Sequence, residues 1–398
     1  MSDFTKLLAI FAILLLTVTA KIYFWEHPLK GFYFLSVSDI MMKAPEFVKK
    51  PIPVPYAGSY IEYPVVLGMW AAFMGALSKS GNDFFILNGL FLCLFSTFNI
   101  LLARNISRRF LNRDVSLFYF LAPSVLLFTF FNWDALALLF LLAAILFLSR
   151  RIVYLGLPLA SLGLWTKIFP GFCLVPAFLI YSRERRFKTL VLPISVVVII
   201  SLLLNLPFYL ISAKGWALFF SFSSKRPPNI DSIWSIFYVV TDRVFGEGFY
   251  LKRYYDLWVN YLSFGLMAGL SIIYFLSKII RRVNFNLLLD TIYIICVFLL
   301  TSKVYSPQYN LWITPLLLII GLNYKKVMLY ELLNFLVLWS VFQYFWGFFI
   351  DGQSALTFPY SKLMYVFVAL RHLLLILLTI DVWRLGQTRT IDTYEKTS

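Results

Sequence analysis

The sequence predicts an all-α polytopic membrane protein, and three observations lead to that prediction. Of the 398 residues, 61% are hydrophobic and only 14% are charged, whereas soluble domains average roughly 45–50% apolar and about 25% charged residues. Mean hydropathy is +0.81. The apolar residues form runs close to the roughly 20 residues that an α-helix needs to cross a bilayer. This composition excludes a soluble enzyme, a disordered chain and a fibrous protein.

The apolar runs divide the chain into about twelve expected spans, which we assign to one membrane domain over residues 1–398. The first run has no signal-peptide cleavage pattern, so we expect it to remain as a span. The run 170–181 is too short to cross alone. No internal repeat is visible, although many transporters are built from repeated halves. The runs are 7–25, 84–103, 115–131, 134–149, 152–168, 170–181, 188–211, 259–280, 286–301, 308–322, 328–348 and 362–382.

Basic clusters predict the orientation of these spans, because Lys and Arg are enriched in cytoplasmic loops. The clusters alternate with polar loops along the chain. This alternation places both termini in the cytoplasm and the loops 26–83 and 212–258 outside. The clusters are Arg104/Arg108/Arg109/Arg113, Arg150/Arg151, Arg183/Arg185/Arg186, Arg281/Arg282, Lys325/Lys326 and Arg384/Arg389.

The apolar run 62–78 conflicts with this alternation. If it crossed the membrane, the arginines at 104–113 would fall outside and every later loop would change side. We therefore expect a helix that lies on or shallowly within the outer leaflet. Pro64 would occupy its first turn, a favoured position for proline.

The net charge of +16 does not predict nucleic-acid binding, because the basic residues lie between apolar runs, where membrane topology accounts for them. Cys93, Cys173 and Cys296 lie inside apolar runs and are expected to be buried apolar side chains. With only His27 and His372 present, a histidine-built metal site is not expected, and no cofactor is predicted.

Two carboxylates at expected outer boundaries are candidate functional groups. Asp39 follows the first apolar run, and Asp134 opens the run 134–149 within Asn132-Trp133-Asp134. Aspartate is also a favoured helix N-cap, so capping remains the alternative role for each.

Cations beside or inside the apolar runs form a second group. Lys167 and Lys303 lie at expected outer boundaries, with snorkelling as the alternative role. Arg371 and His372 fall midway along the run 362–382. A charge at that depth is costly unless it faces protein or water, so it indicates a functional or structural pairing, while His372 alone is more often a satisfied core residue.

The two groups share a chemical logic. Lys167, Lys303, Arg226 and Arg371 are cations suited to a lipid-linked phosphate near a bilayer surface. A carboxylate beside them suits a general base. Together they predict transfer of a group from a lipid phosphate to a hydroxyl.

Several short motifs, in order along nearly the whole chain, resemble the GT-C superfamily of integral-membrane glycosyltransferases. The chain is most similar to the glycosyltransferase family 87 type, which uses polyprenyl-phosphate mannose, and more distantly resembles the GPI mannosyltransferases. Val65 replaces the second proline of a Tyr-Pro-Pro element, and no Asp-x-Asp pair is present. The motifs are Asp39, Pro55-Tyr56, Tyr63-Pro64, Asn132-Trp133-Asp134, Lys167 with Pro170, Asp231-Ser232-Ile233-Trp234 and Ser306-Pro307-Gln308-Tyr309 with Trp312.

The resemblance implies a GT-C fold and an inverting transfer of a sugar, with mannose expected, from a polyprenyl-phosphate donor to an acceptor hydroxyl outside the cell membrane. Asp39 would be the base, and Lys167, Lys303, Arg226 and Arg371 would hold the donor phosphate. The missing Asp-x-Asp pair argues against a bound divalent metal. The residues expected to bind substrate are Tyr56, Glu62, Tyr63, Asp134, Asp231, Trp234, Gln308, Tyr309 and His372.

Two alternatives stay open. A lipid-linked sugar flippase or secondary transporter would predict repeated halves and polar residues at mid-bilayer. A second alternative keeps the enzyme class and changes the sugar to arabinose, glucose or galactose. The acceptor is a glycan, a glycolipid or a protein.

Overall fold

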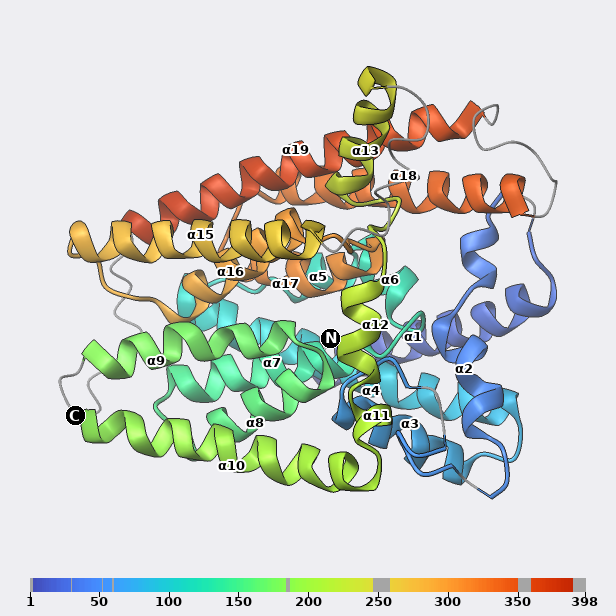
Figure 1. Ribbon diagram of the computed structural model, residues 1–398, viewed down its shortest axis with the longest axis horizontal. Helices are drawn as coiled ribbons and strands as arrows, with labels where there is room; N and C mark the ends of the chain where they lie inside the picture. The colour runs from blue at the N-terminus through green and yellow to red at the C-terminus, as the bar shows by residue number, and fades with distance from the viewer. Residues whose placement is uncertain are drawn as a thin grey trace.

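The computed structural model describes residues 3–29, 31–51, 53–58, 61–183, 187–245, 258–349 and 359–388. Within these ranges the regular structure is helical throughout, with no strand. The basic residues Arg185, Arg186 and Arg389 lie outside them. The chain is therefore an all-α protein over the part that the structure describes (Figure 1).

Six of the described helices are long and apolar enough to cross a membrane. Helices α10 and α15 have mostly exposed apolar windows, which is the pattern of helices that face lipid. The chain is thus a membrane protein. The six helices are α1 (Asp3–Glu26), α4 (Gly81–Leu111), α10 (Phe187–Ile211), α15 (Trp258–Ile280), α18 (Tyr324–Phe349) and α19 (Pro359–Thr388).

A second group of apolar helices is shorter and more enclosed. Helix α7 has 16 residues, or about 24 Å, which is less than the roughly 30 Å bilayer core. Nearly all residues of α16 and α17 are buried, as expected for helices that are apolar on every side. The group comprises α7 (Asp134–Ser149), α8 (Val153–Thr166), α9 (Leu174–Arg183), α16 (Leu287–Thr301) and α17 (Asn310–Ile319).

The expected span 115–131 is not one helix, and this prediction was wrong. It consists of α5 (Ser116–Phe120) and α6 (Pro123–Phe128). Proline disfavours helical backbone in the residue before it, and Ala122 is extended, with ψ 129°. At the start of α6, the backbone amide of Ser124 donates a hydrogen bond to the buried Glu331 carboxylate at 2.8 Å.

Two other runs begin with a tight turn. The 3₁₀ helix η2 (Phe169–Cys173) precedes α9, and η3 (Pro307–Tyr309) precedes α17. Each has a proline in its first turn, where the missing amide hydrogen costs nothing. Lys167 lies just before η2 and Lys303 just before η3, so the two turns help to position both cations.

Shorter helices connect the longer ones, and three of them, α2, α3 and α11, gather at one end of the bundle in Figure 1. The expected helix 62–78 is α3, which starts directly after Pro64. Gly215 of α11 packs against the Tyr56 carbonyl, so closely that an added Cβ would lie 1.7 Å from that oxygen. The two expected outer segments therefore touch. The elements are η1 (Tyr33–Ser36), α2 (Asp39–Phe47), α3 (Val65–Leu77), α11 (Ala213–Trp216), α12 (Leu218–Lys225) and α13 (Ile233–Phe245).

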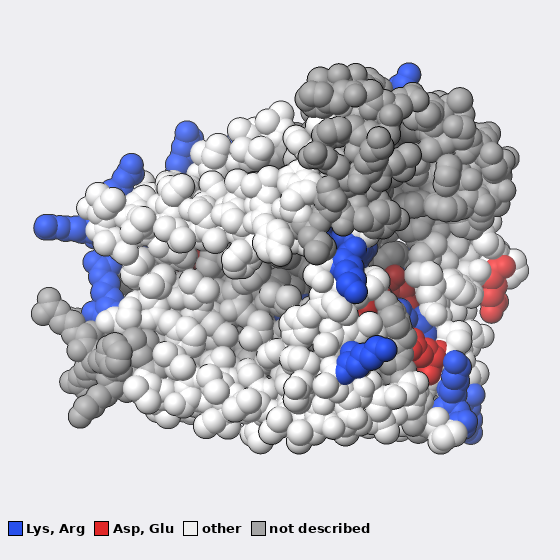
Figure 2. Space-filling view, in the orientation of Figure 1, with Lys and Arg blue, Asp and Glu red and all other residues white. Residues whose placement is uncertain are grey.

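Charged side chains are unevenly distributed over the face in Figure 2. Lys and Arg project along the left edge, near the end of α15 in Figure 1, and the acidic side chains plainly visible on this face lie in the right half, together with further basic ones. An end with predominantly basic side chains is what the positive-inside pattern expects of a cytoplasmic side.

Candidate functional site

The N-terminus of α2 is docked onto the segment that precedes α7. The Asp39 amide donates to the Phe131 carbonyl at 2.9 Å. The Ser38 hydroxyl donates to the neighbouring Phe130 carbonyl, also at 2.9 Å. These contacts join residues more than 90 positions apart in the chain, and they bring Asp39 next to the Asn132-Trp133-Asp134 motif.

The Asp39 carboxylate accepts two hydrogen bonds through one oxygen. The Asn132 amide donates to Oδ2 at 2.7 Å, and the Tyr63 hydroxyl reaches the same oxygen at 3.4 Å. Asn132 also contacts the Tyr63 hydroxyl at 3.1 Å. Oδ1 has no hydrogen-bond partner in the described part of the chain, so one oxygen of Asp39 is held and the other is not.

Burial raises the pKa of Asp39 above its usual value of 3.8, and the charge of Lys167 opposes this rise. The carboxylates of Asp134 and Glu62 raise the pKa further. Like charges nearby disfavour ionisation, so proton affinity increases. Asp39 is therefore a stronger base than an ordinary surface carboxylate.

Asp134 is the first residue of α7 and is completely buried. It does not serve as the N-cap, which is Trp133. Its Oδ1 instead accepts from the Lys167 ammonium at 2.5 Å and from the Trp312 indole at 2.6 Å. Lys167 is thus one half of an ion pair rather than the lone cation that the sequence predicted. Oδ2 of Asp134 is buried without a partner.

Aromatic rings enclose the ammonium of Lys167. It lies 5.7 Å from the ring centres of both Tyr63 and Trp312, a distance typical of cation–π contacts. Trp312 is stacked between Phe169, at 4.0 Å, and Tyr309, at 3.9 Å. Tyr63 contacts both Asp39 and Lys167, so it links the carboxylate to the Asp134–Lys167 pair.

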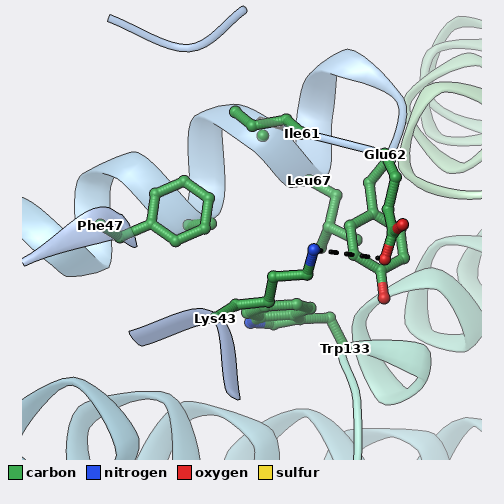
Figure 3. A pocket seen from close by; sticks show the side chains of 9 residues that line it. Lys43, Phe47, Ile61, Glu62, Leu67 and Trp133 are labelled. Atoms are coloured by element: carbon green, nitrogen blue, oxygen red, sulfur yellow. Dashed lines mark ion pairs between the residues drawn. The ribbon is translucent and has the colours of Figure 1, made fainter. Parts of the chain in front are cut away.

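A small pocket opens beside this cluster. Lys43 and Glu62 point toward each other across it and form an ion pair at 3.4 Å, next to Trp133 (Figure 3). Trp133 is fixed by its indole, which donates to Asn88 of α4 at 2.7 Å. The pocket volume is about 10 Å³, room for a single water molecule. A sugar can enter here only if the Lys43–Glu62 pair moves aside.

Tyr56 supports Tyr63 from behind. Its backbone lies in the left-handed region, with φ 68°, and its hydroxyl donates to the Tyr63 carbonyl at 2.8 Å. Gly68 of α3 leaves room for that hydroxyl, because an added Cβ would lie 2.3 Å from it. Tyr56, expected to bind substrate, has a positioning role in this arrangement.

Arg371 is completely buried, and its guanidinium is used inside the protein. It donates to the side chain of Asn334 at 3.0 Å and to the backbone carbonyls of Asp231 and Tyr305. It also stacks on the Tyr305 ring at 3.9 Å. Arg371 therefore connects three segments inside the protein, and its expected contact with a donor phosphate stays a prediction. Its Nε is buried without a partner.

Three expected substrate-binding residues near Arg371 each bury one polar atom without a partner. They are Asp231 (Oδ1), Gln308 (Oε1) and His372 (Nε2). His372 uses its other nitrogen on the Val368 carbonyl at 2.7 Å. Burial raises the pKa of Asp231 to about 6, against the opposing charge of Arg371. Unsatisfied buried groups are rare and mark places where water or a ligand completes the bonding.

Lys303 and Arg226 lie together on the expected outer side. The Lys303 ammonium donates to the carbonyls of Ser224 and Arg226 at 2.9 and 2.6 Å, so it anchors the segment after α12. Burial and, to a smaller extent, the nearby charge of Arg226 together lower the pKa of Lys303 to about 8. Arg226 is exposed and donates to Asn229 at 2.9 Å. Of the four expected phosphate ligands, Arg226 is the exposed one.

Tyr309 lies between two polar clusters. The Asp39 cluster consists of Asp39, Tyr63, Asn132, Asp134 and Lys167. The Arg371 cluster consists of Arg371 with Asp231, Tyr305 and Asn334. It stacks on Trp312 on one side and on Tyr305, at 6.5 Å, on the other. Trp234 is a structural residue, because its indole donates to the Thr301 carbonyl at 2.9 Å. The short helix η3 thus joins the two polar clusters.

Sequence reasoning missed several charged groups. Lys21 in α1 donates to the Phe34 carbonyl at 3.0 Å. Lys278 and Asp290 form a fully buried ion pair at 2.6 Å between α15 and α16. Glu331 is buried against α6 and Asn310. A charged residue inside an apolar run was the signal available for all four groups.

Among the described residues, no group of three or more His, Cys, Asp or Glu side chains could hold a metal ion. No protein-family model, curated protein or solved structure matches the chain. Functional inference therefore rests on the geometry of the two polar clusters.

Proposed function

We propose that this protein is a membrane glycosyltransferase of the GT-C type, with about twelve spans, that transfers a sugar from a polyprenyl-phosphate donor to an acceptor hydroxyl. The observation that supports this most is the meeting of Asp39 with the Asp134–Lys167 pair through Tyr63. These four residues come from four separate segments and lie at or next to helix ends rather than midway along spans. Mannose is the proposed sugar, and the acceptor is a glycan, a glycolipid or a protein.

In the proposed reaction Asp39 acts as general base. Its Oδ1 takes the proton of the acceptor hydroxyl as the hydroxyl oxygen attacks the anomeric carbon. The bond from that carbon to the phosphate oxygen breaks, and the electron pair leaves with polyprenyl phosphate. The raised pKa of Asp39 supports this role, because a base with greater proton affinity is more effective.

Charge on the leaving phosphate needs a nearby cation. Arg226 is the proposed direct ligand, because it is exposed and Lys303 holds its backbone in place. Lys167 balances Asp134 and keeps a positive charge close to Asp39. In this scheme Arg371 and Lys303 position the phosphate-binding segment and do not themselves contact donor.

The proposed topology places the site outside the cell membrane, with both termini in the cytoplasm. The ground is the alternation of basic clusters with polar loops. The site would then face a donor whose phosphate lies at the outer surface of the bilayer and whose polyprenyl chain lies in lipid.

The test is a transfer assay in proteoliposomes with a panel of radiolabelled polyprenyl-phosphate sugars, with nucleotide sugars as controls. We expect a labelled acceptor only with a lipid-phosphate donor. Activity with nucleotide sugars alone would refute the donor class. Passage of labelled lipid across the bilayer without a new glycosidic bond would instead identify a flippase.

The Asp39→Asn variant tests the catalytic assignment. Asparagine keeps the shape and can still accept from Asn132, so donor binding should survive while transfer falls about a hundredfold to ten-thousandfold. Glu62→Gln is the matched control, because Glu62 is already paired with Lys43 and should lose far less. A near-normal rate in Asp39→Asn with a large loss in Glu62→Gln would move the base to Glu62.

A further inference from the structure

A groove separate from both polar clusters lies between α15, α16 and α19. It has a volume of about 610 Å³, within the range of small-molecule sites. Helix α16 packs on both α15 and α19, which lie alongside it in Figure 1. The lining is mostly apolar, but Arg281, Arg384 and Gln387 lie at the end where α15 and α19 finish.

The groove has the dimensions of one lipid leaflet. On α19 its lining runs from Ile376 to Thr388, a rise of about 18 Å. Half of a bilayer core is about 15 Å. The lining residues of α16 are Tyr293, Val297 and Leu300, spaced so that they share one helix face. One acyl chain can therefore lie along it.

A buried network keeps the groove wall in place. Tyr293 stacks on Tyr274 at 3.9 Å, and Trp383 meets both rings edge-on. The Tyr274 hydroxyl and the Lys278 ammonium both donate to Asp290, at 2.7 and 2.6 Å. The aromatic wall is thus fixed from behind by the ion pair that the proposed reaction does not use.

Charge at the mouth is left uncompensated. Arg281 and Arg384 are both exposed and have no carboxylate partner in the described part of the chain. The nearest acids along these helices are already engaged, since Asp381 pairs with Lys326 at 2.7 Å and Asp290 pairs with Lys278. The mouth therefore presents two guanidinium groups, which bind phosphate well.

An unused acceptor lies beside these cations. Gln387 donates to the Ser277 hydroxyl at 2.6 Å, but its Oε1 is buried without a partner. A bound molecule that carries a hydrogen-bond donor, such as a hydroxyl, would complete it. An apolar tail gains little on leaving lipid for an apolar groove, so the head group must decide which lipid binds.

We propose that this groove binds an anionic glycerophospholipid with a free head-group hydroxyl, of the phosphatidylglycerol kind. One acyl chain lies along Tyr293, Val297 and Leu300, the phosphate contacts Arg281 and Arg384, and the hydroxyl donates to Gln387. Basic pockets between membrane helices bind anionic head groups in this way. The lipid site is independent of the proposed sugar transfer.

Native mass spectrometry of the purified full-length protein tests the lipid site, with dioleoylphosphatidylglycerol and dioleoylphosphatidylcholine as competing probes. We expect preferential retention of phosphatidylglycerol. The double variant Arg281→Gln/Arg384→Gln should lose that preference about tenfold or more, since each basic residue near a membrane surface contributes roughly fivefold in affinity for anionic lipid. Equal retention of the two lipids by the wild-type protein would overturn the proposal.

Two further variants separate a site from general charge. Arg109→Gln/Arg150→Gln removes two exposed arginines that do not line the groove and should keep the preference. Leu300→Trp fills the apolar part and should reduce retention of phosphatidylglycerol while leaving both arginines in place. An equal loss in the arginine control, or normal retention in Leu300→Trp, would mean a diffuse surface charge and would refute the groove.

Discussion

The ion pair between Asp134 and Lys167 gives the sharpest test of the site's geometry. If Lys167 had no partner, its removal would leave the fold intact. In the structure Lys167 is instead paired with the buried carboxylate of Asp134. Asp134 is 0% exposed, and among the described residues its bonded oxygen has only Lys167 and Trp312 as partners. Lys167→Met removes the charge at similar length and leaves a buried carboxylate that only one indole stabilises. The expected loss of stability is about 3–5 kcal/mol.

The reverse change is milder. In Asp134→Asn the amide oxygen still accepts from Trp312, and the Lys167 ammonium remains beside two aromatic rings, so we expect a loss of about 1–3 kcal/mol. The double variant has neither charge and should resemble Asp134→Asn. The two single losses together therefore exceed the double loss by the full Lys167→Met loss, about 3–5 kcal/mol, which is at or above the upper end for contacting residues.

The measurement is unfolding of each variant in mixed micelles by added dodecyl sulfate, followed by circular dichroism. Lys326→Met and Asp381→Asn form a matched cycle on an ion pair whose lysine is exposed, where the coupling should not exceed about 1 kcal/mol. If the Asp134–Lys167 coupling is as small as that of the control pair, the buried ion pair does not exist in the native protein and the site geometry is wrong.

Three further predictions follow from single features. Cysteine at exposed Arg113 should resist an impermeant thiol reagent added outside cells, while cysteine at exposed Ser223 should react; labelling at position 113 would reverse the proposed topology. Gly68→Ala puts a methyl group 2.3 Å from the Tyr56 hydroxyl, so thermal stability should fall by about 1–3 kcal/mol, and an unchanged melting temperature would show that Tyr56 is not packed there. Because the pKa of Asp231 is raised to about 6, the folded state holds a proton that the unfolded state loses above about pH 4. The free energy of unfolding should therefore fall as pH rises from about 4 to 6. Asp231→Asn should flatten that slope, and an unchanged pH profile in this variant would exclude Asp231 as the cause.

The positions of most helices could be predicted from the sequence, because apolar runs are a property of consecutive residues. The run 134–149 is helix α7 with the same bounds, and the run 259–280 is α15 within one residue. The predicted span 115–131 was wrong because of a single proline, Pro123. Whether a proline interrupts a helix depends on whether the backbone groups that lose their helical hydrogen bonds find other partners. Glu331, more than 200 positions later, is that partner at α6.

The candidate site was only partly predictable. The motifs identified Asp39, Tyr63, Asp134 and Lys167, and packing brings these four together. Partner choice was not predictable, since the backbone carbonyls that Arg371 and Lys303 contact lie 140 and 79 positions away along the chain. The burial of single residues was also not predictable. Ser107 lies in the middle of a basic cluster, yet it is 0% exposed.

What the sequence by itself determined is the class of the protein, the approximate places of its helices and the inventory of charges near their ends. These follow from composition and from the order of residues, because hydrophobic transfer and charge topology act on consecutive segments. Only the tertiary structure decided which charges pair. Asp134 meets Lys167 and Trp312 across 33 and 178 positions, and a buried charge takes whichever partner packing brings within hydrogen-bond distance, because leaving it unpaired costs more than any local preference supplies.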